Sequence, residues 1–132
     1  RVIFYPPGGK NFVHAEDVAQ GIINALEKGK SGEKYLLGNE NLTFREFFSK
    51  LNKVANQKPL MIKIPKPVLM PLGLVGDLLR LLKIRTNLSS VNMKILCLKN
   101  YYSNTKSATE LGVIYKPVDK AIADAINYFN IV

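Results

Sequence analysis

The sequence has little of the chemistry that metal centres and disulfides require. Among 132 residues it contains one cysteine and one histidine. A single cysteine excludes an internal disulfide and fits a reducing compartment, so a cytoplasmic location is expected. Cys97 lies in an apolar run and is predicted to be a small buried side chain. One cysteine and one histidine cannot form a zinc site without several carboxylates, so no metal is expected.

The sequence also lacks a glycine pattern for a dinucleotide. No Gly-x-Gly-x-x-Gly follows a strand-like segment, and the pair Gly8-Gly9 does not have the spacing that places a pyrophosphate at a helix N-terminus. We therefore expect no cofactor-binding residues and no bound cofactor in this chain.

Acidic residues are scarce, with 10 Asp and Glu against 19 Lys and Arg, which gives a formal net charge of +9. Basic chains can bind nucleic acid or anionic membranes. The lysines are spread along the whole length, however, and no basic helix face carries stacking aromatic residues. We expect no nucleic-acid partner; the weaker reading, a basic nucleic-acid-binding domain, predicts salt-sensitive DNA binding.

No uninterrupted apolar run reaches the roughly 20 residues that span a membrane. Residues 67–82 come nearest, but Pro71, Gly73, Asp77 and Arg80 interrupt them. We expect a buried or pocket-lining helix there and no membrane partner. A helix that docks on a membrane surface or a protein is the alternative.

The length fits one domain. Residue spacing predicts a mostly helical α/β chain with a few short strands. Residues 43–46 give the clearest local signal, because Thr43 followed by Glu46 forms a capping box, and Leu42 can pack on Phe47. Gly29 and Gly112 are predicted helix stops. The expected strands cover residues 11–13, 33–37 and 60–64, and the expected helices 16–28, 43–56, 67–82, 89–98, 103–111 and a final one after Pro117.

Two arrangements look catalytic but are predicted to be structural. His14 would need an acid and a nucleophile nearby to form a triad, and the spacing shows neither. Tyr102 and Lys106 match Tyr-x-x-x-Lys, but Tyr102 precedes the predicted cap Ser103, so only the lysine would lie on the helix. We therefore assign no catalytic residue to this chain. Asp17 is expected to serve the N-terminus of its helix.

Several segments, in their order and spacing, resemble the C-terminal portion of extended short-chain dehydrogenase/reductases. This family contains NAD-dependent epimerases, dehydratases and dihydroflavonol-type reductases. The similar segments are residues 9–19 (GKNFVHAEDVA), 32–38 (GEKYLLG), 42–46 (LTFRE), 103–112 (SNTKSATELG) and the terminal helix 121–129.

The resemblance implies that an N-terminal Rossmann portion, which binds NAD or NADP and supplies a Tyr/Lys pair, is absent, together with most of the Rossmann sheet. Residues 1–132 would form a single substrate-binding portion. Nucleotide-sugar members place an arginine where this chain has Lys10, and carry Arg-Pro-Gly-Asp where it has residues 97–102. These departures favour the dihydroflavonol-reductase or hydroxysteroid-dehydrogenase-like branch, with a less polar substrate. The expected substrate-binding residues are Lys10, Asn11, Phe12, Met70, Leu74 and Leu78.

The first hypothesis is therefore the substrate-binding part of an NAD(P)-dependent reductase or epimerase/dehydratase acting on a small carbonyl or hydroxyl substrate, inactive alone. The second is a non-enzymatic module that uses residues 67–82 to bind a partner or a membrane surface. A severed portion should expose apolar surface on residues 16–28 and 33–37. We expect homodimers or other self-association through these residues.

Overall fold

The computed structural model describes residues 1–131. This part of the chain forms six helices and five short strands, which confirms the predicted mostly helical α/β class. Their order is β1 (Val2–Tyr5), β2 (Gly9–Phe12), α1 (Ala15–Lys28), β3 (Glu40–Thr43), α2 (Phe44–Val54), β4 (Leu60–Lys63), α3 (Lys66–Leu81), α4 (Ser90–Cys97), β5 (Lys99–Asn100), α5 (Thr105–Leu111) and α6 (Val118–Ile131).

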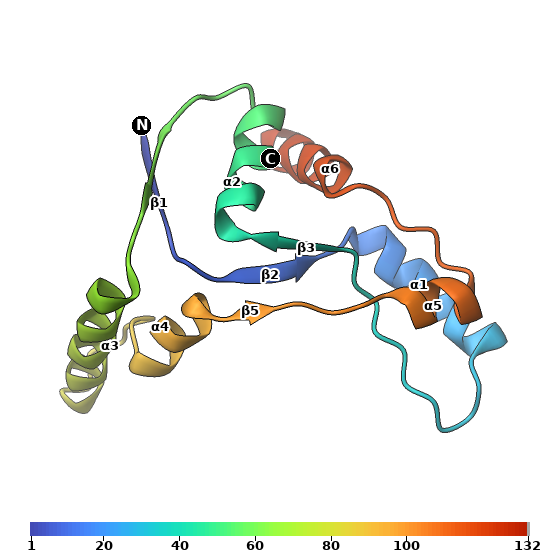
Figure 1. Cartoon of the computed structure of the whole chain (residues 1–132), viewed down its shortest axis with the longest axis horizontal. Coiled ribbons are helices and arrows are strands. Elements are labelled where there is room, and N and C mark those ends of the chain that lie inside the picture. The colour runs from blue at the N-terminus through green and yellow to red at the C-terminus, as the bar shows by residue number, and fades with distance from the viewer. Residues whose placement is uncertain (132) are drawn as a thin grey trace.

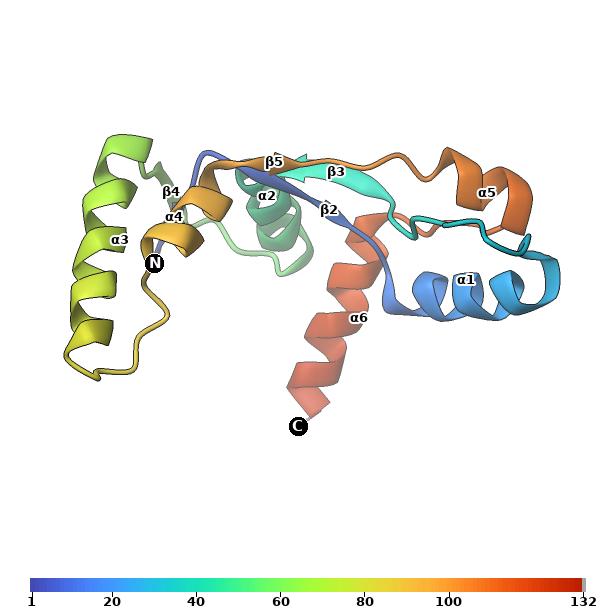
Figure 2. The same cartoon turned by 90° about the horizontal axis from the view of Figure 1, so that it is seen from below.

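The strands form two small sheets. β1 pairs with β4 in parallel, and β2 lies between antiparallel β3 and parallel β5. The three-stranded sheet crosses the middle of the molecule, with α3 and α4 at one end and α1 and α5 at the other (Figure 1). Figure 2 shows α6 extending away from this sheet, with the C-terminus at its far end. The central strand β2 therefore connects the two helical ends.

Local sequence signals set several helix boundaries as predicted. The capping box of α2 is formed: Glu46 N donates to Thr43 Oγ1, and Thr43 N donates to Glu46 Oε2. Gly29 follows α1 as its C-cap. Gly112 ends α5 in the left-handed conformation, with φ 67° and ψ 31°, which glycine adopts without a Cβ penalty. These signals need only neighbouring residues, which is why the sequence reveals them.

The predicted strand at residues 33–37 is wrong, since this segment has no ladder partner and no regular structure. A strand is stable only when its backbone groups are paired. Residue spacing did not predict β1 and β3, whose partners are distant in the sequence. Asn104, rather than Ser103, is the N-cap of α5. Cys97 is half-buried, not fully buried.

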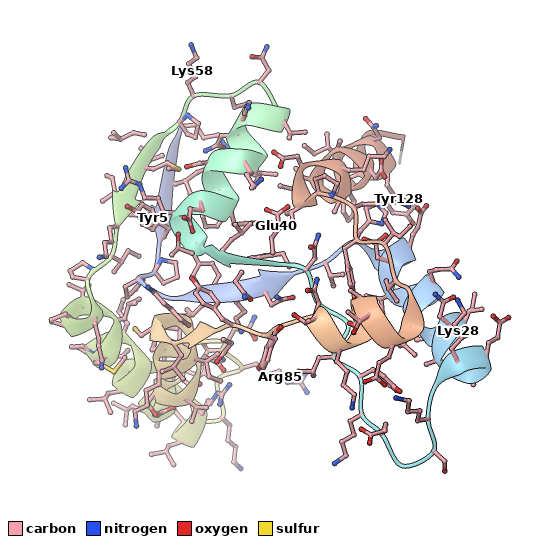
Figure 3. All side chains as sticks on the ribbon, turned by 45° about the vertical axis from the view of Figure 1, so that its right-hand side comes forward. Tyr5, Lys28, Glu40, Lys58, Arg85 and Tyr128 are labelled. Atoms are coloured by element: carbon pink, nitrogen blue, oxygen red, sulfur yellow. The ribbon has the colours of Figure 1, made fainter. Side chains whose placement is uncertain are left out.

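The buried apolar side chains fall into few places. Leu111, Val113, Val118 and Ile122 belong to α5, α6 and the segment between them. Large exposed apolar side chains are far more numerous than buried ones. Figure 3 shows the side chains spread over separate elements. A chain of this length that buries so little has apolar surface left for a partner.

Candidate substrate site

Three predicted substrate-binding residues lie on the central strand β2. Lys10 is in register with Leu42 of β3 and Asn100 of β5, and Phe12 is in register with Glu40. Side chains alternate between the two faces of a strand. Lys10 and Phe12 therefore lie on one face, and Asn11 lies on the other. The sheet does not bring the three side chains to one point.

Lys10 is half-buried and takes part in no ion pair of the described residues. Lysine presents a point charge without the planar fork with which arginine binds a phosphate through two hydrogen bonds. Lys10 keeps a positive charge on the strand and loses the geometric selectivity that arginine would provide.

Asn11 is used within the fold. Its Nδ2 donates to Asn41 Oδ1 at 2.7 Å, and its Oδ1 accepts from Asn39 N at 3.0 Å. A Cβ on Gly38 would collide with the Asn11 amide oxygen, so residue 38 must be a glycine for this contact to form. Asn41 in turn donates to Tyr102 O at 2.9 Å. Asn11 thus fixes the loop before β3 against the sheet.

Phe12 lines an apolar groove that the sequence did not predict. Its ring stacks on Phe47 of α2, with ring centroids 4.2 Å apart and planes 6° apart. The groove is a cavity of about 470 Å³ between β2, α2 and α6, within the size range of small-molecule sites. The helical spacing of the apolar residues was the signal that could have indicated it. The remaining lining residues are Val13, Leu51, Val118, Ala121, Ile122, Ala125, Ile126 and Phe129.

The other three predicted residues lie on α3, away from β2. Met70 is half-buried, but Leu74 and Leu78 are 64% and 58% exposed. The helix packs on α4 through its glycines instead: a Cβ on Gly73 would lie 2.7 Å from Ser90 Cα. A buried or pocket-lining helix was expected here; burial is wrong for the leucine face, and the pocket-lining role stays a prediction. The groove beside Phe12 contains no residue of α3.

His14 is buried and acts as the N-cap of α1. Its Nδ1 accepts from Glu16 N at 3.1 Å, so Nε2 carries the proton and donates to Asp124 Oδ2 at 2.9 Å. Lys120 also binds Asp124, and its hydrogen bond, followed by that of His14, lowers the pKa of the Asp124 carboxyl. Both ring nitrogens are occupied, which leaves no atom of His14 to activate a nucleophile.

The Tyr102–Lys106 pair does not have the catalytic arrangement. Tyr102 precedes α5, and Lys106 forms an ion pair with Glu33 that raises the pKa of the lysine. The Lys106 Nζ also lies 4.9 Å from the centroid of the Tyr35 ring. Lys106 therefore ties α5 to the loop after α1, and it is not directed at a tyrosine hydroxyl one helical turn away.

The Gly8-Gly9 pair does not offer its backbone donors to a dinucleotide. Gly8 N donates to Leu96 O at 3.1 Å and Gly9 N donates to Leu98 O at 3.0 Å, so both backbone donors are used within the fold. A pyrophosphate site needs free N–H groups at a helix N-terminus.

Within residues 1–131, no cluster of three or more His, Cys, Asp or Glu side chains could hold a metal ion. None of the described helices is long and apolar enough to cross a membrane.

Two curated proteins are similar to the chain over nearly all of its length. One, from Synechocystis sp., is named provisionally as a dihydroflavonol 4-reductase; it is 28% identical, and the match covers 95% of this chain and 38% of the relative. The other, sterol demethylase protein B of Methylococcus capsulatus, is 26% identical over 98% of this chain and 40% of the relative. The chain thus spans about two fifths of the length of these relatives. No protein-family model matches it.

Two solved structures share the fold. The crystal structure of gox2253 is 36% identical with a TM-score of 0.76, over 96% of this chain and 39% of the other. The UDP-glucuronic acid 4-epimerase of Bacillus cereus, in complex with NAD, has a TM-score of 0.56 at 16% identity, over 96% of this chain and 34% of the other. These matches confirm the resemblance to the C-terminal portion of an extended short-chain dehydrogenase/reductase. The chain is similar in sequence to the provisionally named dihydroflavonol 4-reductase and shares its fold with the epimerase.

Proposed function

We propose that this chain is the substrate-binding portion of an NAD(P)-dependent reductase or epimerase/dehydratase, and that a separate nucleotide-binding portion completes the enzyme. The relatives favour an enzyme over a non-enzymatic binding module. The dinucleotide would belong to the other portion, because the backbone donors of Gly8 and Gly9 are already occupied. The catalytic tyrosine would belong there as well, because Tyr102 precedes α5 and does not lie one helical turn from Lys106.

The observation that carries the proposal is an apolar face on α1 that the chain leaves uncovered. Ile22, Ile23 and Leu26 are 55%, 51% and 85% exposed, and Leu36 of the following loop is exposed as well. Complete burial of an exposed side chain of this size contributes about 1.5–3 kcal/mol, and each of these side chains would gain the part that corresponds to its exposed fraction. A chain that spans two fifths of its relatives and exposes a face of this kind fits a portion that packs against the remainder.

The proposed substrate is less polar than a nucleotide sugar. Phe12 would supply an aromatic surface and Lys10, on the same face of β2, a single positive charge; Met70, Leu74 and Leu78 lie on α3, away from β2, and would form a separate apolar wall. Such a set suits a small carbonyl or hydroxyl compound held mainly by apolar contacts, with few polar groups to orient it.

Titration of the chain with NADH and NADPH, followed by the fluorescence of the reduced nicotinamide, tests whether the dinucleotide site lies outside this chain. We expect no saturable binding to the 132-residue chain. Saturable binding at micromolar concentration would overturn the proposal that the dinucleotide site lies in another portion. The Bacillus cereus epimerase, whose structure contains NAD, serves as the positive control.

The apolar wall is tested separately by ligand-observed NMR with dihydroquercetin, a dihydroflavonol. Leu74→Ser is expected to weaken the signal transferred to the ligand. Leu81→Ser is the matched control, since Leu81 lies on the same helix and is more exposed. Equal loss in both variants would show that the contact is not specific to the proposed wall.

A further inference from the structure

Three cationic side chains from different elements line one small hollow. Arg45 lies in the first turn of α2, Lys63 ends β4, and Lys99 begins β5. The hollow measures about 250 Å³ and opens beside Tyr5, at the end of β1. Figure 3 labels Tyr5 close to the start of α2. The other lining residues are Pro6, Pro7, Gly8 and Thr43.

These three charges are not neutralised within the described part of the chain. The ion pairs of the described residues involve other cations, and none includes Arg45, Lys63 or Lys99. Glu46 is the nearest acid in the sequence, but it does not line the hollow, and its Oε2 binds Thr43 N at 2.8 Å. The hydrogen bond from the Thr43 hydroxyl is the main cause that lowers the pKa of Glu46, and the Lys99 charge contributes least.

The N-terminus of α2 adds to the positive potential. Thr43 is the N-cap of this 11-residue helix, and both Thr43 and Arg45 line the hollow. The helix dipole places a partial positive charge at this end. The Glu46 carboxylate and the Thr43 hydroxyl already satisfy donors at this end, so an anion in the hollow would be attracted mainly by the side-chain charges of Arg45, Lys63 and Lys99.

Backbone hydrogen bonds hold the walls in place. Phe44 N donates to Gly8 O at 3.1 Å, Ile64 N to Tyr5 O at 2.9 Å, and Gly8 N to Leu96 O at 3.1 Å. These bonds join α2, β4 and α4 to the turn between β1 and β2. The backbone of the wall is therefore ordered before a ligand binds, and the conformational entropy lost on binding would come from the three exposed cationic side chains.

The hollow lies on the opposite side of the sheet from Lys10. Gly9 is in register with Thr43 and with Lys99, so these residues share one face. Lys10 is the next residue along β2 and lies on the other face, because strand side chains alternate. Any anion bound in the hollow is thus not bound by the predicted substrate-site lysine.

We propose that this hollow is a binding site for a phosphate-class anion, separate from the proposed substrate site. Arg45 offers a fork that matches two phosphate oxygens, and Lys63 and Lys99 supply point charges. The volume of about 250 Å³ lies below the roughly 300–1,000 Å³ of pockets that enclose drug-sized ligands. The hollow therefore suits a phosphoryl group and not a whole nucleotide sugar.

Isothermal titration calorimetry of the 132-residue chain with inorganic phosphate tests the site, with chloride held constant. We expect saturable binding that the triple variant Arg45→Gln/Lys63→Gln/Lys99→Gln weakens at least about tenfold, because charge-assisted hydrogen bonds are lost. Arg45→Lys keeps the charge and removes the fork, so an intermediate loss is expected. Circular dichroism confirms that each variant is folded.

The matched control is Lys28→Gln/Lys34→Gln/Lys58→Gln, which removes the same net charge from positions that do not line the hollow. Equal weakening by both triple variants would overturn the proposal, since it would indicate attraction by net charge alone. Absence of saturable binding to the unmodified chain at millimolar phosphate would overturn it as well. Phenyl phosphate distinguishes a phosphorylated ligand from free phosphate. An affinity equal to that of inorganic phosphate supports a phosphoryl group on a larger molecule, and a weaker affinity supports the free ion.

Discussion

Replacing Asp17 by alanine should detach the end of α1 from the segment before α6. Asp17 is 3% exposed, and its Oδ2 accepts from Lys116 N at 2.7 Å across 99 residues of sequence. Hydrogen bonds to charged groups contribute about 1.5–3 kcal/mol, and an unsatisfied buried donor costs about 1–3 kcal/mol. These are two descriptions of the same loss, so we expect the free energy of unfolding to fall by about 2–3 kcal/mol.

Urea unfolding followed by circular dichroism measures this change, with unaltered m-values as evidence that the unfolding transition is comparable. For a chain of this size, the loss corresponds to a midpoint temperature roughly 8–12 °C lower. Asp17→Asn keeps an oxygen acceptor and removes the charge, so about half of the loss is expected. Glu27→Ala, on an exposed position of the same helix, should change stability by no more than about 0.5 kcal/mol. If Asp17→Ala and Glu27→Ala lower the free energy of unfolding by the same amount, the buried hydrogen bond between Asp17 and Lys116 does not stabilise the fold.

Three further changes follow from the structure. Thr43→Ala removes the capping box of α2 and should lower the free energy of unfolding by about 1 kcal/mol in urea titrations. The Lys50 hydrogen bond lowers the pKa of Asp119; the stabilisation is therefore present above the unfolded pKa and lost as pH falls through the folded pKa. The stability advantage over Lys50→Gln should shrink between pH 7 and pH 3 in urea titrations. Ile22→Ser/Leu26→Ser should reduce concentration-dependent association in sedimentation velocity, because it removes the exposed apolar face of α1.

Each of these predictions has a control. Ser49→Ala, on an exposed position of α2, should leave stability nearly unchanged; equal effects at Thr43 and Ser49 would refute the role of the cap. A stability difference between the unmodified chain and Lys50→Gln that is the same at both pH values would exclude the Lys50–Asp119 pair as its source. A chain that is monomeric before substitution at Ile22 would contradict the predicted self-association.

The helices could be predicted because their signals are local. Thr43 with Glu46, and Gly112 after α5, mark helix ends through contacts within a few residues. The strands were less predictable than the helices, because each strand depends on a distant partner. β1, for example, pairs with β4 across more than 50 residues. The segment 33–37 has the composition of a strand, but no partner pairs with it here.

The candidate site was predicted less well than the fold. Asn11 was expected to face a substrate, yet its amide binds Asn39 and Asn41. The groove beside Phe12 requires α2 and α6 to meet; the spacing of apolar residues marks the apolar face of each helix but does not show that the two faces meet. The hydrogen bond between His14 and Asp124 joins residues that lie 110 positions apart in the sequence. Such contacts depend on how the chain folds back on itself, which residue spacing does not reveal.

The coding sequence immediately upstream of Arg1 tests the central claim most directly. The account predicts a glycine-rich strand-turn-helix followed by a helix with Tyr-x-x-x-Lys, in frame with this chain. Cofactor and substrate assays would then be made on the whole encoded protein. A start codon directly before Arg1 would contradict the claim, because the chain would then have no nucleotide-binding portion to complete it.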